Sequence, residues 1–181
     1  TWFATEQLGI QPDILNMAKS MAGGYAPIGA VITTDEIANG IDHFRHVHTY
    51  SGHAVCCAAA LKVIEIKERE GLVERSAALG EEWQADMKAQ LLDIPGVGDI
   101  RGRGFWQAID FTSDKATHAK PDLQMVLDIA ERCRELGVIV GPIGTAIELA
   151  PGLIATAEQL QQCTSALAQA ISEVAPKYSL N

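Results

Sequence analysis

The sequence predicts an α/β chain in two parts, an apolar α/β segment over residues 1–70 and a smaller α+β domain over residues 71–181. The first part is dense in glycine and alanine and poor in charge, which is typical of strands and helices buried on several sides. The second part has amphipathic helical patterns separated by short apolar runs. With 181 residues, 48% of them hydrophobic, the chain is long enough to bury a core.

Two short buried strands are expected in the first part. Residues 12–19 predict a turn followed by a buried strand that ends at Lys19. Gly23 and Gly24 break this run, and residues 29–33 form a second apolar run that predicts another buried strand.

A helix is expected over residues 54–70, at the end of the first part. Its first half is entirely apolar and charged residues appear only later, so we expect it to begin inside the protein and emerge towards solvent. Gly71 is placed to cap its C-terminus, because glycine adopts the left-handed conformation that ends many helices.

In the second part, helices and strands alternate. In chain order, we expect a helix over residues 73–91 that stops before Pro95, two strands within residues 97–111, a helix from Pro121 closed by Gly137, short strands over residues 138–140 and 147–149, and a last helix. The helix after Pro121 is expected to turn one stripe to the core: Leu123, Val126, Leu127, Ala130 and Cys133. Thr156 and Gln159 form a capping box at the start of the last helix.

The charge balance excludes several classes of function. Acidic residues outnumber basic ones 23 to 14, a net charge of −9, which argues against binding nucleic acid through its phosphates. We also expect no membrane span, because the most apolar stretch, residues 138–157, contains Glu148 and two prolines. The N-terminus has neither an initiator Met nor a signal pattern, and we interpret it as a chain already under way.

The cysteines and histidines predict neither disulfides nor a metal site. The four cysteines, Cys56, Cys57, Cys133 and Cys163, form no Cys-x-x-Cys pair and are typical of reduced thiols in a cytoplasmic protein. Four histidines crowd a short stretch: His43, His46, His48 and His53. Metal ligands need convergent geometry, usually with a carboxylate or cysteine close by, so loop packing or interface contacts explain these histidines better.

Lys19 is the first candidate for chemistry. It follows an apolar strand, has no acidic neighbour closer than Asp13, and precedes two glycines that let a backbone approach a flat ligand. An apolar site disfavours the charged form of lysine and makes its amine nucleophilic. On the pattern alone, the favoured interpretation is a lysine that extends from a strand end into water.

Whole segments of the chain resemble class III aminotransferases, which are pyridoxal-phosphate enzymes of fold type I. The resemblance covers essentially the whole chain and is carried by residues 12–31, 48–61, 70–75, 97–104 and 149–154. It implies that residues 1–70 are the end of the large cofactor-binding domain and that residues 71–181 are the small C-terminal domain. It also begins part-way through the family, so we interpret the chain as a C-terminal portion that is inactive alone.

The resemblance gives roles to two residues. It implies that Lys19 forms a Schiff base with pyridoxal phosphate and then moves a proton between the substrate and the cofactor. It implies that Thr49 holds the cofactor phosphate of the partner subunit, in a homodimer or larger assembly. A hydroxyl beside a helix N-terminus is a good phosphate site on physical grounds too, although Thr49 in a simple turn or cap is the alternative.

The function implied is transamination between an amine or ω-amino acid and a keto acid such as pyruvate. Residues 49–53 look most like those of transaminases that use such donors. The alternatives are an aminomutase, racemase or decarboxylase of the same fold, and a non-catalytic fragment or interaction domain.

Glu148 is the candidate substrate-binding residue. In many family members that hold an α-carboxylate, an arginine stands just before the Leu-Ala-Pro stretch, where this chain has Glu148. Alternation along the strand places Glu148 on the face opposite Ile147 and Leu149. A carboxylate there would attract an ammonium group, whereas the alternative is that Glu148 faces solvent or pairs with an arginine.

Arg101 and Arg103 lie among glycines and could suggest an anion site. A structural salt bridge within the strand pair is the favoured interpretation. Residues 102–104 lack the third glycine and the following helix of a dinucleotide-binding motif.

Overall fold

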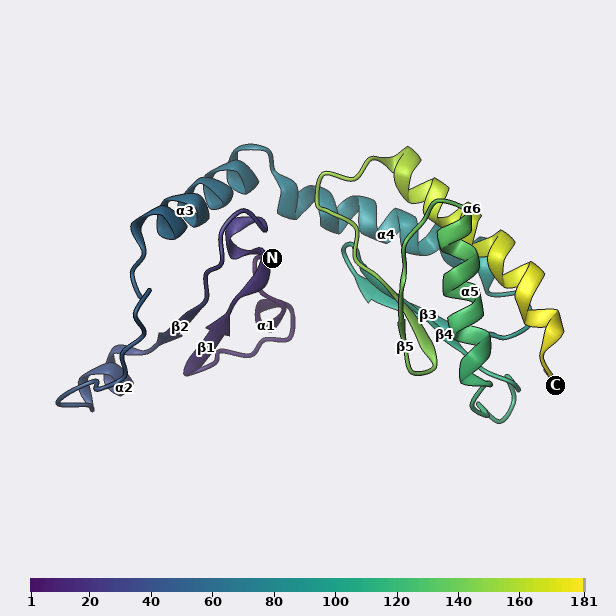
Figure 1. Cartoon of the computed structure of the whole chain (residues 1–181), viewed down its shortest axis with the longest axis horizontal. Coiled ribbons are helices and arrows are strands. Elements are labelled where there is room, and N and C mark those ends of the chain that lie inside the picture. Colours follow the sequence, from purple (N-terminus) through teal and green to yellow (C-terminus); the bar gives the residue numbers. More distant parts are fainter. Residues whose placement is uncertain (181) are drawn as a thin grey trace. The chain divides into compact units, whose positions relative to one another are not determined.

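The computed structural model describes residues 1–180, and the chain divides into two compact units (Figure 1). Unit 1 is Thr1–Val73, and unit 2 begins at Glu74. Both units contain helices and β-strands, so the predicted α/β class is confirmed. Among residues 1–180, no helix combines the length and the apolar character needed to cross a membrane.

Unit 1 is built on a two-stranded antiparallel ribbon and one long helix. Its ribbon pairs β1 with β2 in a register that runs from Ile14 opposite Thr33 to Met17 opposite Ala30. The long helix packs against the short 3₁₀ helix that follows β1. Its elements are α1 (Ala4–Gln7), β1 (Ile14–Met17), η1 (Lys19–Ala22), β2 (Ala30–Thr33), α2 (Asp35–Asn39) and α3 (Ala54–Arg69).

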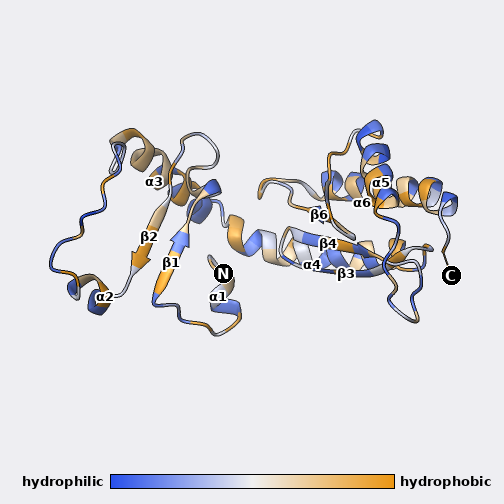
Figure 2. Cartoon of the chain, turned by 60° about the horizontal axis from the view of Figure 1, so that its bottom comes forward, coloured by the Kyte–Doolittle hydropathy of each residue, from blue (hydrophilic) through white to orange (hydrophobic). Residues whose placement is uncertain are grey.

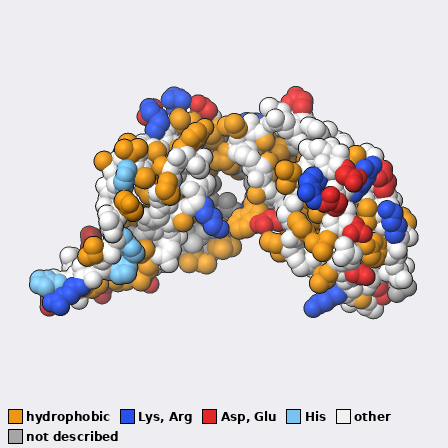
Figure 3. All heavy atoms as spheres, in the orientation of Figure 1, with side chains coloured by type: hydrophobic (Ala, Val, Ile, Leu, Met, Phe, Trp, Pro, Cys, Tyr) orange, Lys and Arg blue, Asp and Glu red, His pale blue; other side chains and the backbone are white. Residues whose placement is uncertain are grey.

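The expected burial of these apolar runs is wrong for this chain. Val31 in β2 and Leu61 in α3 are each 68% exposed, and Ala60 is the buried residue of α3. Hydrophobic side chains lie open over the surface of unit 1, and β2 is coloured towards the hydrophobic end of the scale (Figures 2 and 3). The reason is that a ribbon and one helix have too little surface to cover one another, whatever their composition.

Unit 2 is a four-stranded antiparallel sheet with helices packed on one face. The strand order is β3-β4-β6-β5. The β3–β4 hairpin and the β5–β6 hairpin are joined by the pairing of β4 with β6. Side chains from α4, α5 and α6 share one core with the sheet. The elements are α4 (Leu72–Leu91), which begins at the end of unit 1, β3 (Val97–Arg103), β4 (Trp106–Phe111), α5 (Leu123–Glu135), β5 (Gly141–Ile143), β6 (Ala146–Leu149), α6 (Ala157–Val174) and η2 (Ala175–Lys177).

Most expected elements of the second part are confirmed. The helix before Pro95, the two strands around Gly102 and Gly104, and the capping box of Thr156 and Gln159 are all present. In that capping box, the Thr156 hydroxyl accepts from the Gln159 amide while the Gln159 side chain accepts from the Thr156 amide.

Two details of the expected pattern are wrong. The α5 face that meets the core carries Met125, Val126, Ile129 and Cys133, whereas Leu123 and Leu127 are about half exposed. Apolar residues lie on both sides of this helix, so the helical spacing is compatible with two different buried faces.

The strand expected over residues 138–140 lies instead at Gly141–Ile143. Gly137 adopts a positive φ of 86°, and the Val138 amide donates to the Cys133 carbonyl, which closes α5 with a Schellman-type turn. Val138 therefore ends a helix, and the following strand starts later.

One close approach fixes α4 on the β3–β4 hairpin. A Cβ atom added to Gly80 would lie 2.3 Å from the Gly104 carbonyl oxygen, far inside van der Waals contact. Gly104 has a φ of +53° in the turn between the strands. The helix and the turn thus touch through backbone alone, and only glycine fits at position 80.

We expect Gly80→Ala to destabilise the chain. In an ordinary helix this change stabilises by about 1 kcal/mol, because alanine is the better helix former. Here the added methyl must push α4 off the hairpin, so the free energy of unfolding should fall by about 1–3 kcal/mol. Gly152→Ala is the matched control, since a Cβ atom there meets nothing within 4 Å. Urea unfolding measures both, and equal stability of the two variants would contradict the contact.

Candidate functional site

Lys19 stands at a strained point of unit 1. It is the first residue of η1, directly after β1, and its φ is +59°. Within residues 1–180, His118 is the only other non-glycine residue with a positive φ. A left-handed conformation costs a residue with a Cβ atom about 1–2 kcal/mol, and such strain is concentrated at functional sites. The conformational preference of lysine therefore does not explain the left-handed backbone at this position.

The Lys19 amine has no hydrogen bond or ion pair to any other part of residues 1–180, and its side chain is exposed. Lys67, another lysine of unit 1, behaves differently. Lys67 Nζ lies 3.5 Å from the Ser20 carbonyl oxygen and 5.9 Å from the centroid of the Trp2 ring. Lys19 thus has a primary amine available for a ligand, while Lys67 ties α3 to η1.

Thr49 lies in the turn that leads into α3. The Ser51 amide donates to the His48 carbonyl at 3.0 Å, and Gly52 follows with a φ of +66°. His53 is the N-cap of α3 but makes no side-chain cap, and the first turn contains no acidic residue. The first amides of the helix are therefore open to an anion, as the positive end of the helix dipole favours.

A cavity of about 800 Å³ adjoins this turn within unit 1. It is lined by His48, by residues 50–53 of the turn, by Cys56 and Cys57 in the first turn of α3, and by the stretch from Pro27 to Ala30 that enters β2. Neither Lys19 nor Thr49 lines it, and no contact joins the two residues. The structure therefore places both candidates in unit 1 without bringing them together.

Glu148 lies in unit 2, on β6. Ile147 and Leu149 are buried while Glu148 is only partly buried, so the expected alternation is confirmed. Its partner is the Trp106 indole, whose Nε1 donates to Glu148 Oε1. Within residues 1–180 Glu148 makes no ion pair, so of the two expected alternatives the arginine partner is wrong, while the partly exposed side chain agrees with a solvent-facing position. The sequence reasoning missed Trp106, although strand alternation on β4 could have placed it on this face.

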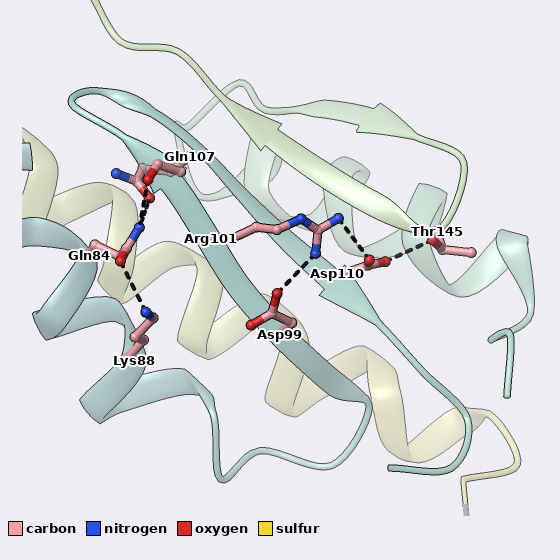
Figure 4. Close-up of polar contacts among 8 residues, drawn as sticks. Gln84, Lys88, Asp99, Arg101, Gln107, Asp110 and Thr145 are labelled. Carbon is pink, nitrogen blue, oxygen red and sulfur yellow. Dashed lines mark hydrogen bonds and ion pairs between the residues drawn. The ribbon is translucent and has the colours of Figure 1, made fainter. Parts of the chain in front are cut away.

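Arg101 is used in a salt-bridge network on the same sheet (Figure 4). Its guanidinium lies 3.0 Å from Asp110 and 3.1 Å from Asp99, and the Thr145 hydroxyl donates to the other oxygen of Asp110. Hydrogen bonds to Asp110 and then Asp99 raise the pKa of Arg101 above its usual value. The favoured interpretation, a structural salt bridge, is confirmed for Arg101. Arg103 is exposed and has no ion-pair partner among the described residues.

The histidine cluster lies in an exposed stretch of unit 1, where the rings contact one another. The rings of His46 and His48 meet edge to face at 4.4 Å, and Phe44 packs beside His46. Across residues 1–180, no three His, Cys, Asp or Glu side chains converge in a way that could hold a metal ion.

Comparison with known proteins gives a consistent result. The sequence model of the family described as "Aminotransferase class-III" matches residues 1–171. The hypotaurine/taurine–pyruvate aminotransferase of Paracoccus denitrificans is 32% identical over 96% of this chain. The 5-aminovalerate aminotransferase of Pseudomonas aeruginosa is 40% identical over 97% of this chain. The chain spans 41% of the length of each.

Solved structures agree with the sequence relatives. An amine transaminase from an uncultivated Pseudomonas species, in its PLP-bound form, superposes with a TM-score of 0.92 at 34% identity. An ω-aminotransferase from Paracoccus denitrificans has the same TM-score of 0.92 at 33% identity. The matches cover 96% and 98% of this chain, and 41% of each of those structures.

The strain at position 19 predicts that Lys19→Gly makes η1 harder to open. Glycine relieves the left-handed strain but adds chain entropy, a net gain of about 0.5–1 kcal/mol. Amide hydrogen exchange of η1, followed by mass spectrometry, should slow by about two- to fivefold. Lys19→Ala is the control, because it keeps the Cβ atom and the strain. Exchange in the glycine variant as fast as in the alanine variant would count against strain at this position.

The thiols should divide into two classes. Burial raises the pKa of Cys133 to about 12 and that of Cys163 to about 11, so few thiolates form there at pH 8. Cys57 is exposed. Iodoacetamide should label Cys57 in the native chain and reach Cys133 and Cys163 only after addition of denaturant. Peptide mapping checks this, and equally fast labelling of Cys57 and Cys133 would contradict the packing of α5 on α6.

Proposed function

This chain belongs to the class III aminotransferases, and from that premise we propose that it forms the C-terminal portion of an enzyme that transfers an amino group. The donor is an amine or an ω-amino acid, and the acceptor is a keto acid such as pyruvate. The observation that carries the proposal is Lys19, a lysine with a free amine on a strained turn inside the matched segment. Its relatives named above act as aminotransferases, which favours transamination over an aminomutase, racemase or decarboxylase.

The fold of the chain is that of a fold type I fragment, as its neighbours among solved structures indicate. We propose that residues 1–70 are the end of the large cofactor-binding domain and that residues 71–181 are the small domain. The chain divides into two compact units after Val73, which supports this boundary. Because the chain spans 41% of its relatives' length, we propose that it is inactive by itself.

The residues of unit 1 fit pyridoxal phosphate, the cofactor of this family. A free primary amine at Lys19 suits its aldehyde carbon, and glycines at positions 23 and 24 let the backbone lie close to a flat ring. The Thr49 hydroxyl and the open amides at the start of α3 suit the phosphate of a second cofactor molecule, the one bound by the partner subunit. When bound, the cofactor supplies a conjugated ring that accepts the electron pair left at the substrate Cα.

Lys19 performs two tasks in the proposed reaction. Its Nζ holds the cofactor covalently until the amine of the donor takes its place. The released amine then removes the proton from the donor Cα and delivers a proton to the neighbouring carbon of the cofactor. A lysine suits both tasks because its flexible stem lets one nitrogen reach both atoms, while the strained turn fixes where the stem starts.

Thr49 is proposed to bind the cofactor phosphate of a partner subunit in a homodimer or larger assembly. The wide exposure of apolar side chains on unit 1, such as Val31, Val47 and Tyr50, supports burial of this surface in an assembly. The four free cysteines support a reducing compartment, and we propose the cytoplasm.

Substitution of Lys19 tests the function in the complete enzyme. Lys19→Ala should abolish amino transfer from an amine to pyruvate and remove the absorbance of the lysine-bound cofactor. Lys62→Ala is the matched control, since Lys62 is an exposed lysine whose one ion-pair partner among residues 1–180 is Glu65. Normal turnover by the Lys19 variant, together with a cofactor linkage that borohydride still reduces, would show that another residue carries the chemistry.

Substitution of Thr49 tests the phosphate site. Thr49→Ala should leave the covalent linkage possible but weaken cofactor retention by about ten- to a hundredfold, the loss of one charge-assisted hydrogen bond. Thr49→Ser keeps the hydroxyl and should retain the cofactor. Equilibrium dialysis of the cofactor measures all three proteins, and equal retention by the alanine and serine variants would remove Thr49 from the site.

A further inference from the structure

Unit 2 contains a cavity that none of the candidate site residues Lys19, Thr49 and Glu148 lines. Its volume is about 560 Å³, within the range typical of small-molecule sites. No residue of unit 1 lines it, so the cavity lies within one compact unit. Its charged lining comes from β3, from β4 and from the loop that follows β4: Asp99, Arg101, Asp110, His118 and Lys120.

On the strand side of the cavity, Arg101 is fixed between two carboxylates (Figure 4). Its guanidinium lies 3.1 Å from Asp99 and 3.0 Å from Asp110. Both oxygens of Asp110 are used, because the second one accepts from the Thr145 hydroxyl. Asp99 uses Oδ2 for the arginine, and within residues 1–180 its Oδ1 accepts no hydrogen bond. This side therefore carries two negative charges against one positive charge, and it has one free acceptor oxygen.

On the other side, the loop that follows β4 holds His118 in a left-handed conformation, with a φ of +55°. The chain around His118 is fixed by hydrogen bonds, since the Ser113 amide donates to the Ala119 carbonyl and the Ala116 amide donates to Asp114. Strain of this kind persists only where surrounding contacts over-determine it, and it is concentrated at functional sites. The ring of His118 makes no hydrogen bond in the described part of the chain, so its ring N–H is available to a ligand.

Lys120 adds a positive charge to the same side of the cavity. Its side chain is exposed, and among the described residues its Nζ makes no hydrogen bond or ion pair. Asp99 and Asp110 line the same cavity, yet neither pairs with Lys120. The cavity thus has unpaired groups of opposite charge that are not in contact with each other.

These charges select the class of ligand. A simple anion is attracted by Lys120 but repelled by Asp99 and Asp110, and a simple cation meets the reverse. A small molecule that carries both an ammonium group and a carboxylate group is attracted at both ends.

We propose that this cavity binds an α-amino acid in its zwitterionic form. The ligand carboxylate accepts from Lys120 Nζ and from the ring N–H of His118, and the ligand ammonium donates to Asp99 Oδ1. The site is separate from Lys19 and Thr49, and binding there does not depend on the proposed transfer reaction.

Binding can be measured on the 181-residue chain at a resonance of the site itself. The chain has five histidines, and His118→Asn identifies the ring C–H resonance of His118 by its loss. Asparagine suits this position because it tolerates the left-handed region. L-Valine, which has one ammonium, one carboxylate and no other polar group, should shift the His118 resonance in a saturable way. Isovalerate lacks the ammonium and isobutylamine lacks the carboxylate, so each should bind about tenfold or more weakly, the loss of one charge-assisted contact.

Three variants test the two ends of the ligand. Lys120→Gln removes the charge of an exposed side chain without a partner among the described residues, and the affinity for L-valine should fall by about tenfold or more. Asp99→Asn keeps an acceptor oxygen but removes its charge, and a similar fall is expected. Lys177→Gln is the matched control, because Lys177 is an exposed lysine of unit 2 that does not line the cavity.

The half-ligands also distinguish the alternatives. Isovalerate that binds as tightly as L-valine would overturn the proposal in favour of an anion site, and isobutylamine that does so would overturn it in favour of a cation site. The absence of a saturable shift with L-valine, or an affinity that stays unchanged in Lys120→Gln or in Asp99→Asn, would overturn it as well.

Discussion

Unit 2 depends on a sheet that is covered on one face only. Ile100, Ile109, Ile147 and Leu149 point into the helices, and every second residue of each strand must therefore point the other way. This alternation fixes the strand register, because a slip of one residue would bury Glu148 and expose Ile147. The core and the open face are consequences of the same constraint, and on the open face Arg101 pairs with Asp99 and Asp110.

Backbone contact sets the second constraint in this unit. Gly80 lets α4 approach the Gly104 turn, and at Gly102 an added Cβ atom would lie 2.2 Å from the Trp106 carbonyl oxygen. Gln107 is buried beside this contact, where it donates to the Gly104 carbonyl and accepts from Gln84 (Figure 4). The start of β4 is thereby held on its buried side, which orients Trp106 towards the open face.

The sequence predicts this unit well because its signals are local. Periodicity, the capping box and the glycine that ends α5 each act over a few residues, and each is present in the structure. The strand start at Gly141 was missed because the Val138 amide donates to the Cys133 carbonyl at the end of α5. This hydrogen bond assigns Val138 to the helix end, and the apolar pattern does not reveal it. The partner of Glu148 was missed because Trp106 lies 42 residues away and meets it only through strand pairing.

Unit 1 shows what local signals cannot predict. Its apolar runs correctly indicate β1, β2 and α3, yet burial depends on what covers them, and within residues 1–180 Val31 and Leu61 stay exposed. The φ of Lys19 is equally invisible in the sequence, since a lysine has no preference for the left-handed region. Such strain persists only where surrounding contacts over-determine it. The proposed catalytic lysine therefore lies in the unit whose apolar side chains are the least covered.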